Sequence, residues 1–543
     1  MLRELLTVRR DDDVVALVTQ LVANNTDLAV RAAKVSQLEK RNAELEKQLE
    51  RVLARYKKSE AVSKAQLVLF LDALSRGEAG DVIEEGDPRG DANERLRDAS
   101  GIDQARDDEP KTKPPRRPSV RRPAPPDLSR IENPIPVPAA DRPCPRCGKP
   151  RTCIGHDITE VIELVPAQVI VRQDKREKLA CQDCEGELVR APKVDKVVEG
   201  GKYGDALEAD ILVNKYADGL PLHRQKERFA RLGLNLPIST LVDQVRWSTD
   251  LVRPLWRAAI AECIASKVMH VDGTGLRVLD RGAPGGKRLG TLWGYVGDDV
   301  AAYVYTSTAK AVAQQPGEMG PEDILSLREG FTVADAGSQF AASFAQHPKL
   351  IACGCNMHGR RYFTKALDAG DKRAALPLAA YKRLYEIEEE IRDRDPDGKL
   401  AVRVEKSKPV FDELVRWAEV HQPFEAPSSK LGEAIRYLLN HRAALGRFLE
   451  SGLVPIDNGA VERLHIRAAL TRENFLFAGS DAGGERAAVA FTILGCCRIA
   501  GVNPFEYLTA VFPIMAAGVR LIDLPDLLPA RWQARRDAAP AAG

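Results

Sequence analysis

The chain has 543 residues, 44% of them hydrophobic, which is enough apolar material for several folded domains rather than one. Its 80 basic and 78 acidic residues nearly cancel, so a surface for a polyanion must be local rather than a property of the whole chain. The N-terminal segment has no long apolar core, and charges interrupt the apolar stretches near the C-terminus. We therefore expect neither a secretory signal nor a membrane span, and a cytoplasmic location.

Residues 1–76 are predicted to form a helical region with a leucine-zipper pattern. Apolar side chains recur at alternating steps of three and four from Val35 to Tyr56, with Asn42 at one seam position. A polar residue there can fix the register of a dimer. Because the seam lasts only about three heptads, a homo-oligomeric coiled coil and a helix packed on its own chain fit equally well.

Residues 77–143 have the composition of a linker. Charged residues crowd its first half, and 11 of the 34 residues from Pro110 to Pro143 are proline. Such a segment cannot bury enough apolar surface to offset the entropy of ordering it. The composition predicts a disordered Pro- and charge-rich linker.

Residues 144–192 are bounded by two C-x-x-C pairs, which predict a small zinc-binding domain. The four thiols are Cys144, Cys147, Cys181 and Cys184. Two such turns bring four thiolates into the tetrahedron that structural Zn²⁺ prefers, with no position left for water. The competing interpretation is a redox pair or four cysteines without a common role.

Residues 205–250 read as three helices, with a turn at 233–237 before the third, which Ser239 is expected to cap. The segment resembles a helix-turn-helix and is interpreted as a helical DNA-binding segment. A plain helical bundle fits equally well because the turn exceeds the usual three or four residues. Five cations accompany it: Arg224, Lys226, Arg228, Arg231 and Arg246.

Beyond residue 267 the pattern becomes β. Alternating apolar runs predict strands at 268–279, 288–297, 301–306, 331–334 and 350–355, with a helical stretch at 321–328 before the fourth strand. Three antiparallel strands, a helix and a further strand follow the order of a ribonuclease-H-like domain, in which the first and fourth strands are neighbours.

The remaining segments complete a multidomain α+β protein. The ribonuclease-H-like catalytic domain is expected to span 267–500. A charged helical insertion is expected at about 365–450, and a helical tail at 501–543.

Three acids stand where such a fold could join them. Asp272 lies at the end of the first strand, Asp335 follows the fourth, and Glu462 lies in the first turn of a helix. Three carboxylates suit two Mg²⁺ ions about 4 Å apart. The residues alone leave a second interpretation open, because a chain with 78 acids offers many aspartates after strands and Glu462 could simply favour its helix N-terminus.

Several motifs resemble those of insertion-sequence-66 transposases. They lie at 212–225, 355–361, 454–463, 472–480, 483–486 and 524–532. The cysteine unit resembles the family's zinc-binding domain, and the N-terminal seam its leucine-zipper region. The sequence departs from the family pattern at Gly273, where Glu is frequent, and at Gly459, where a second Asn is frequent.

The resemblance implies a DDE transposase that cleaves insertion-sequence ends and transfers the strands by a two-metal mechanism. Asp272, Asp335 and Glu462 would be its catalytic ligands for Mg²⁺ or Mn²⁺. The implied partners are element-end and target DNA, a second copy of the chain and accessory proteins of the same element, in a nucleoid-associated location. A retired transposase that only binds DNA and a ribonuclease-H-like nuclease are the alternatives.

Four arginines are the candidates for contacts with DNA phosphates. Arg360 and Arg361 belong to the motif at 355–361, and Arg463 and Arg467 flank Glu462. Guanidinium groups at such positions could hold the DNA backbone, or could cover a helix face without binding anything.

Overall fold

A computed structural model describes residues 88–101, 167–179, 189–192, 201–310, 317–335 and 338–538, with Arg146, Lys149, Val197 and Val198. The chain divides into two compact units. The insertion unit comprises residues 1–103 and 354–457, and the sheet unit comprises 104–353 and 458–543. The predicted leucine zipper, most of the linker and the four cysteines of the zinc motif lie outside the described residues.

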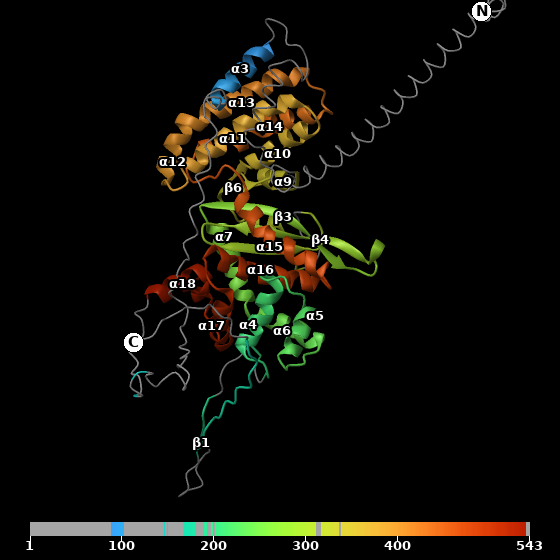
Figure 1. The fold of residues 1–543 in the computed structure, drawn as a ribbon, viewed down its shortest axis with the longest axis vertical. Helices are drawn as coiled ribbons and strands as arrows, with labels where there is room; N and C mark the ends of the chain where they lie inside the picture. The colour runs from blue at the N-terminus through green and yellow to red at the C-terminus, as the bar shows by residue number, and fades with distance from the viewer. Residues whose placement is uncertain are drawn as a thin grey trace, which may run out of the picture. The chain divides into compact units, whose positions relative to one another are not determined.

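A five-stranded sheet forms the centre of the sheet unit (Figure 1). Its strand order is β5-β4-β3-β6-β7. The strands are β3 (Val268–Leu279), β4 (Lys287–Val296), β5 (Ala301–Thr306), β6 (Gly330–Ala334) and β7 (Leu350–Gly354). All five predicted strands are confirmed to within a residue at each end.

The strand pairing follows from the local turns and from burial. The two tight turns after β3 and β4 make β3, β4 and β5 an antiparallel meander. β6 returns after the helical stretch α8 (Pro321–Leu325) and pairs parallel with β3. The predicted adjacency of the first and fourth strands is therefore correct. All six residues of β5 are buried, as expected of a strand covered on both faces.

Helices from both ends of the sheet unit pack on this sheet or on the helices that cover it. They are α4 (Asp205–Tyr216), α5 (Leu222–Arg231), α6 (Ile238–Leu251), α7 (Arg253–Ala265), α9 (Ser338–Gln346), α15 (Gly459–Phe475), α16 (Asp481–Ile499), α17 (Pro504–Ala517) and α18 (Pro529–Ala538). α15 packs on β3 and β4, whereas α16 packs on β5. α16 is apolar on nearly every side, which is the pattern of a helix enclosed by its neighbours.

The expected cap of the third helix is wrong. α6 begins at Ile238, and its cap position is Pro237, which offers no side-chain oxygen. Ser239 lies inside the first turn and is exposed. The fixed φ of Pro237, −61°, starts the helix in place of a hydroxyl cap.

The insertion unit is helical, as predicted for this stretch. It contains α10 (Asn356–Asp368), α11 (Ala375–Glu390), α12 (Pro396–Val402), α13 (Lys408–His421) and α14 (Lys430–Gly446). Among the described residues, no helix of either unit is long and apolar enough to cross a membrane.

One part of the expected linker is folded. Residues 88–100 form helix α3 (Pro88–Ser100), which packs on α11 and α13 of the insertion unit. Asn93 accepts a 2.7 Å hydrogen bond from the Trp417 indole, and the Arg89 guanidinium lies 4.4 Å from the Phe424 ring centre. The disordered linker predicted for 77–143 is thus wrong at these residues, because Ala92 and Leu96 of α3 are buried and the helix packs on α11 and α13.

Candidate active site

Asp272 and Asp335 lie at corresponding positions on two adjacent strands. In the parallel pair β3–β6, Val271 is in register with Ala334, so each aspartate is the next residue along its strand. Both side chains are half-buried. The expectation that Asp272 ends its strand is wrong, because β3 continues to Leu279 in its pairing with β4. It is β6 that ends here, at Ala334, so Asp335 follows a strand end beside the middle of β3.

Glu462 lies in the first turn of α15, and a buried amide fixes this turn to β3. The Asn458 side chain donates a 2.9 Å hydrogen bond to the Val271 carbonyl, and its amide oxygen is 2.9 Å from His270 Nδ1. Asn458 stands at the cap position of α15 yet makes no capping bond with its side chain, since β3 uses that side chain instead. The two bonds therefore hold His270 and Val271, the two residues that precede Asp272 on β3.

A second contact holds the other end of α15. Arg472 donates to the Thr274 hydroxyl at 2.8 Å and to the Gly275 carbonyl. α15 is therefore tied to β3 on both sides of Asp272. Gly294, which pairs with Asp272 across β3–β4, permits this approach, because a Cβ there would lie 2.8 Å from His465 Cε1.

His465, one turn after Glu462, lies against Asp272. Its Nδ1 is 3.0 Å from the Tyr303 hydroxyl, and its Nε2 is 3.6 Å from Asp272 Oδ2. Nε2 is buried and has no hydrogen-bond partner at this distance. Burial lowers the pKa of His465 to about 4, although the contact with Asp272 opposes this shift. The imidazole is thus uncharged at neutral pH.

The donor set fits a hard divalent cation. Three carboxylates are the ligands that Mg²⁺ and Mn²⁺ prefer, and the orphaned His465 Nε2 marks a polar site whose hydrogen bonding is incomplete. Among the described residues, the oxygens of Asp272, Asp335 and Glu462 do not all lie within 4.8 Å of one another.

The departure at Gly273 has a structural explanation. A Cβ at Gly273 would lie 2.7 Å from the Trp293 ring, which occupies the adjacent position on β4. The Trp293 indole donates a 2.8 Å hydrogen bond to the Thr306 hydroxyl and is fully buried. The tryptophan fills the space that a larger residue at 273 would need.

The four candidate DNA-contacting arginines differ in exposure. Arg463 and Arg467 on α15 are exposed, and the Arg467 guanidinium reaches the Ala217 carbonyl at 3.1 Å. Arg360 and Arg361 belong to the insertion unit and are half-buried. The Arg360 guanidinium lies 5.9 Å from the Tyr385 ring centre. The exposed arginines of the four are thus Arg463 and Arg467, on the helix that carries Glu462.

Little of the cysteine-bounded unit is described. Cys144, Cys147, Cys181 and Cys184 lie outside the described residues. β1 (Lys178–Leu179) and β2 (Val189–Arg190), which lie before and after Cys181 and Cys184 in the sequence, pair antiparallel.

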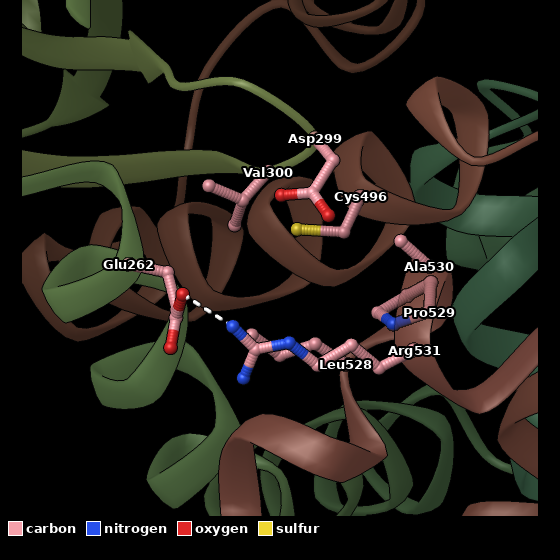
Figure 2. Close-up of a pocket in the computed structure, with 8 residues that line it drawn as sticks. All are labelled: Glu262, Asp299, Val300, Cys496, Leu528, Pro529, Ala530 and Arg531. Carbon is pink, nitrogen blue, oxygen red and sulfur yellow. Dashed lines mark hydrogen bonds and ion pairs between the residues drawn. The ribbon is translucent and has the colours of Figure 1, made fainter. Parts of the chain in front are cut away.

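A cavity elsewhere in the sheet unit is not a site of chemistry. Figure 2 shows Arg531, at the start of α18, reaching Glu262 of α7, and this ion pair is 2.7 Å long. The enclosed space is about 10 Å³, room for no more than one water. It marks where the C-terminal helix is attached, away from Asp272 and its neighbours.

Sequence reasoning missed the residues that assemble the acids. Asn458 and Arg472 stand inside motifs that the resemblance singled out. Asn458 was given no role, and Arg472 was expected to contribute to a phosphate surface, whereas it bonds to Thr274 and Gly275 of β3. A buried asparagine immediately before a helical glycine-alanine pair is a weak signal on its own. Its partners His270 and Val271 are almost 190 residues away in sequence, 188 and 187 positions respectively.

Comparison with known proteins identifies the family. Residues 200–486 match the model of the transposase IS66 family, and residues 141–185 match its zinc-finger binding domain. An uncharacterized protein of Sinorhizobium fredii, y4hP, is 32% identical over 76% of this chain and 77% of its own length. A second from the same organism, y4qI, is 31% identical over 78% of this chain and 79% of its own. The chain therefore belongs to the IS66 family of transposases, DNA-acting enzymes with a zinc-binding domain.

Proposed function

We propose that this transposase cleaves insertion-sequence ends and joins them to target DNA with an Asp-Asp-Glu active site that uses two divalent ions. The observation that carries the proposal is the junction of β3, β6 and α15. There, two aspartates follow paired residues on parallel strands, and buried hydrogen bonds hold the glutamate-bearing helix against one of them.

The strand order supports a ribonuclease-H-like catalytic domain. A three-stranded antiparallel meander and a fourth strand parallel to the first are the arrangement that the sequence predicted for that fold. The helical insertion lies in the sequence between Asp335 and Glu462, which are 127 positions apart. All three acids nevertheless belong to the sheet unit.

Each residue has a distinct part in the proposed reaction. Asp272, Asp335 and Glu462 would hold Mg²⁺ or Mn²⁺, which supplies an activated oxygen nucleophile and neutralises charge on the leaving oxygen. His465 stays uncharged beneath Asp272 and limits that carboxylate's freedom to rotate. Arg463 offers an exposed guanidinium next to Glu462 for a phosphate of the DNA backbone.

The test is a cleavage and strand-transfer assay on DNA carrying the inverted repeats that flank the gene, with Mg²⁺ present. Asp272→Asn, Asp335→Asn and Glu462→Gln keep the side-chain size but each removes a negative oxygen donor. We expect both reactions to fall by orders of magnitude while DNA binding persists. Near-normal transposition by any variant rejects the role of that residue.

Two matched controls separate catalysis from folding. Asp280→Asn changes an acid just beyond β3 that pairs with Arg288, and Glu473→Gln changes an exposed acid on α15 itself. Both should leave cleavage within a few-fold of the wild type. A control as damaged as the active-site variants would show that any acid near this sheet is needed for folding.

The family's zinc domain leads to a second proposal about this chain's own thiolates. Cys144, Cys147, Cys181 and Cys184 should hold one structural zinc per chain, because two C-x-x-C turns close a tetrahedral site. Metal analysis of the purified protein tests this. A zinc content that Cys144→Ser and Cys181→Ser leave unchanged would place the metal elsewhere.

Arg463 and Arg467 are proposed to contact DNA phosphates. Such contacts release counterions, so each one adds roughly one unit to the slope of log K against log salt. Arg463→Ala should weaken binding equally for element-end and unrelated duplexes and reduce that slope by about one. An unchanged slope would assign Arg463 to the protein surface alone.

A further inference from the structure

The three helices α4, α5 and α6 form a rigid module within the sheet unit. Phe229, Leu241 and Val245 are buried between them, and Arg228 is held by Asp210 of α4 at 2.6 Å. The buried Gln225 amide donates to the Ile211 and Leu220 carbonyls at 3.2 and 3.0 Å. These bonds hold α5 in a fixed position against α4.

The outward face of α6 combines apolar and polar side chains at helical spacing. Ile238 and Val242, four residues apart, are 45% and 42% exposed. Ser239 and Arg246 are exposed on the same side. The Arg246 side chain is half exposed, 3.9 Å from Asp243 and 5.6 Å from the Trp247 ring centre. Large aliphatic side chains exposed at this spacing on a well-packed helix indicate a contact surface.

The neighbouring helix α5 adds positive charge. Arg224, Lys226 and Arg231 are exposed, and no acidic partner of theirs occurs within the part of the chain that the structure describes. The acids on the two helices are Glu227, Asp243 and Asp250, the last of which pairs with Arg253 at 3.2 Å. With Arg246 counted, the cations outnumber these acids by four to three. The fourth arginine of the segment, Arg228, is already paired with Asp210.

This combination fits duplex DNA. Aliphatic groups contact thymine methyls in the major groove, a serine hydroxyl can bond either base edge, and an arginine binds guanine through two hydrogen bonds. Cations on the preceding helix would meet the phosphates that border the groove. A protein partner would favour a larger apolar centre with fewer unpaired cations.

We propose that α6 reads a DNA sequence in the major groove through Ser239, Val242 and Arg246, while Arg224 and Arg231 of α5 bind the flanking phosphates. The inference deepens the proposed function by assigning recognition of element ends to this module. It rests on that function only for the identity of the DNA, since sequence-specific binding can be measured without cleavage.

The experiment is a selection from random 30-base-pair duplexes (about three helical turns) with the full-length protein, followed by sequencing and binding assays on the enriched motif. The variants on α6 are Val242→Ala and Arg246→Ala, and those on α5 are Arg224→Ala and Arg231→Ala. Arg442→Ala is the matched control, because it removes an exposed arginine from α14 of the other unit. Melting temperatures confirm that each variant is folded.

We expect wild type and control to enrich the same motif. The α6 variants should lose preference at one or two positions of it, with a drop in discrimination on the order of tenfold or more. The α5 variants should keep the motif but bind every sequence more weakly, with a salt slope reduced by about one each. Asp272→Asn should behave as the wild type.

Two results overturn the inference. One is an enriched motif that the α6 variants retain in full, which would assign recognition to another part of the chain. The other is normal DNA binding by all four variants together with lost self-association, which would make the face a protein interface. Intact α6-dependent recognition with inactive cleavage by the wild type would leave the inference standing and reject the proposed function.

Discussion

The two units each contain a buried polar network, and the networks differ in how completely their bonds are made. In the insertion unit, Arg403 is 2% exposed and donates to both oxygens of Glu388 and to three backbone carbonyls. In the sheet unit, His465 is also buried, but its Nε2 has no hydrogen-bond partner and faces the half-buried Asp272.

We propose that this difference separates a structural network from a functional one. Arg403 uses its donors to join α11 to the loop after α14, and it leaves no atom for a ligand. The network around Asp272 fixes the backbone on both sides of the acid through Asn458 and Arg472, while the carboxylates themselves remain half-buried. A site prepared for a ligand has a fixed frame and incomplete bonding at its centre.

The largest effect is expected in the insertion unit. Arg403→Ala leaves Glu388 without its cation and three carbonyls without a donor, so it should reduce the free energy of unfolding by about 3–5 kcal/mol. Thermal unfolding of the full chain measures this. Arg416→Ala, whose 3.0 Å ion pair with Glu413 is exposed on one side, should cost less than about 1 kcal/mol. Equal losses in the two variants would contradict the structural role of Arg403.

A buried acid provides an intermediate case with a pH signature. Glu208 is 1% exposed and accepts a 2.9 Å hydrogen bond from Ser248, and burial raises its pKa from 4.5 to about 7. Between these values the unfolded chain loses the proton while the folded chain keeps it, so stability should fall as pH rises from 4.5 to 7 and level off above.

Glu208→Gln removes this titration. The contribution amounts to roughly 3 kcal/mol across the window at 1.36 kcal/mol per unit. Chemical unfolding at pH 5 and pH 8 should show a smaller difference between the two pH values in the variant than in the wild type. The same pH dependence in both proteins would mean that Glu208 ionises freely in the fold.

The Asn458 hydrogen bonds that hold α15 against β3 should affect activity more than stability. Asn458→Ala removes two buried hydrogen bonds and leaves the Val271 carbonyl unpaired, at a cost of about 1–3 kcal/mol. Because Glu462 follows one turn later, DNA cleavage should fall at least tenfold at a temperature where the variant is folded. A folded Asn458→Ala protein with full activity would show that these bonds do not align the acids.

The close approach of α15 to Gly294 gives a last test of the position of this helix. Gly294→Ala places a methyl group 2.8 Å from His465 and 3.1 Å from Val461, which forces α15 away from the sheet at a cost of about 1–3 kcal/mol. Gly204→Ala, at a position with open space around it, is the control. Cleavage should fall only for Gly294→Ala. Equal activities would show that the site tolerates a displaced α15.

The sheet could be predicted from the sequence because the residue pattern that specifies each strand lies within that strand and its adjoining turns. The runs at 268–279 and 301–306 alternate or bury apolar residues between tight turns, so the strands appear at the expected positions. α3 was not predicted because its charged, proline-flanked segment resembles a linker and its order comes from α11 and α13. Ser239 was assigned a capping role that Pro237 makes unnecessary.

The candidate site was predictable only in its acids. Asp272, Asp335 and Glu462 follow recognisable strand and helix positions, and their motifs resemble a family. The frame around them depends on contacts such as Tyr303–His465, which joins residues 162 positions apart, and no local pattern reports such a pair. The orphaned Nε2 of His465 became visible only when its surroundings were known.

The central claim is that the three acids together bind divalent ions, and Mn²⁺ binding tests it most directly. Electron paramagnetic resonance titration of the full chain should show Mn²⁺ sites that Asp272→Asn, Asp335→Asn and Glu462→Gln each weaken. Asp280→Asn should bind as the wild type does, and the structural zinc gives no signal in this measurement. Mn²⁺ binding that is unchanged when all three acids are replaced together would contradict the account.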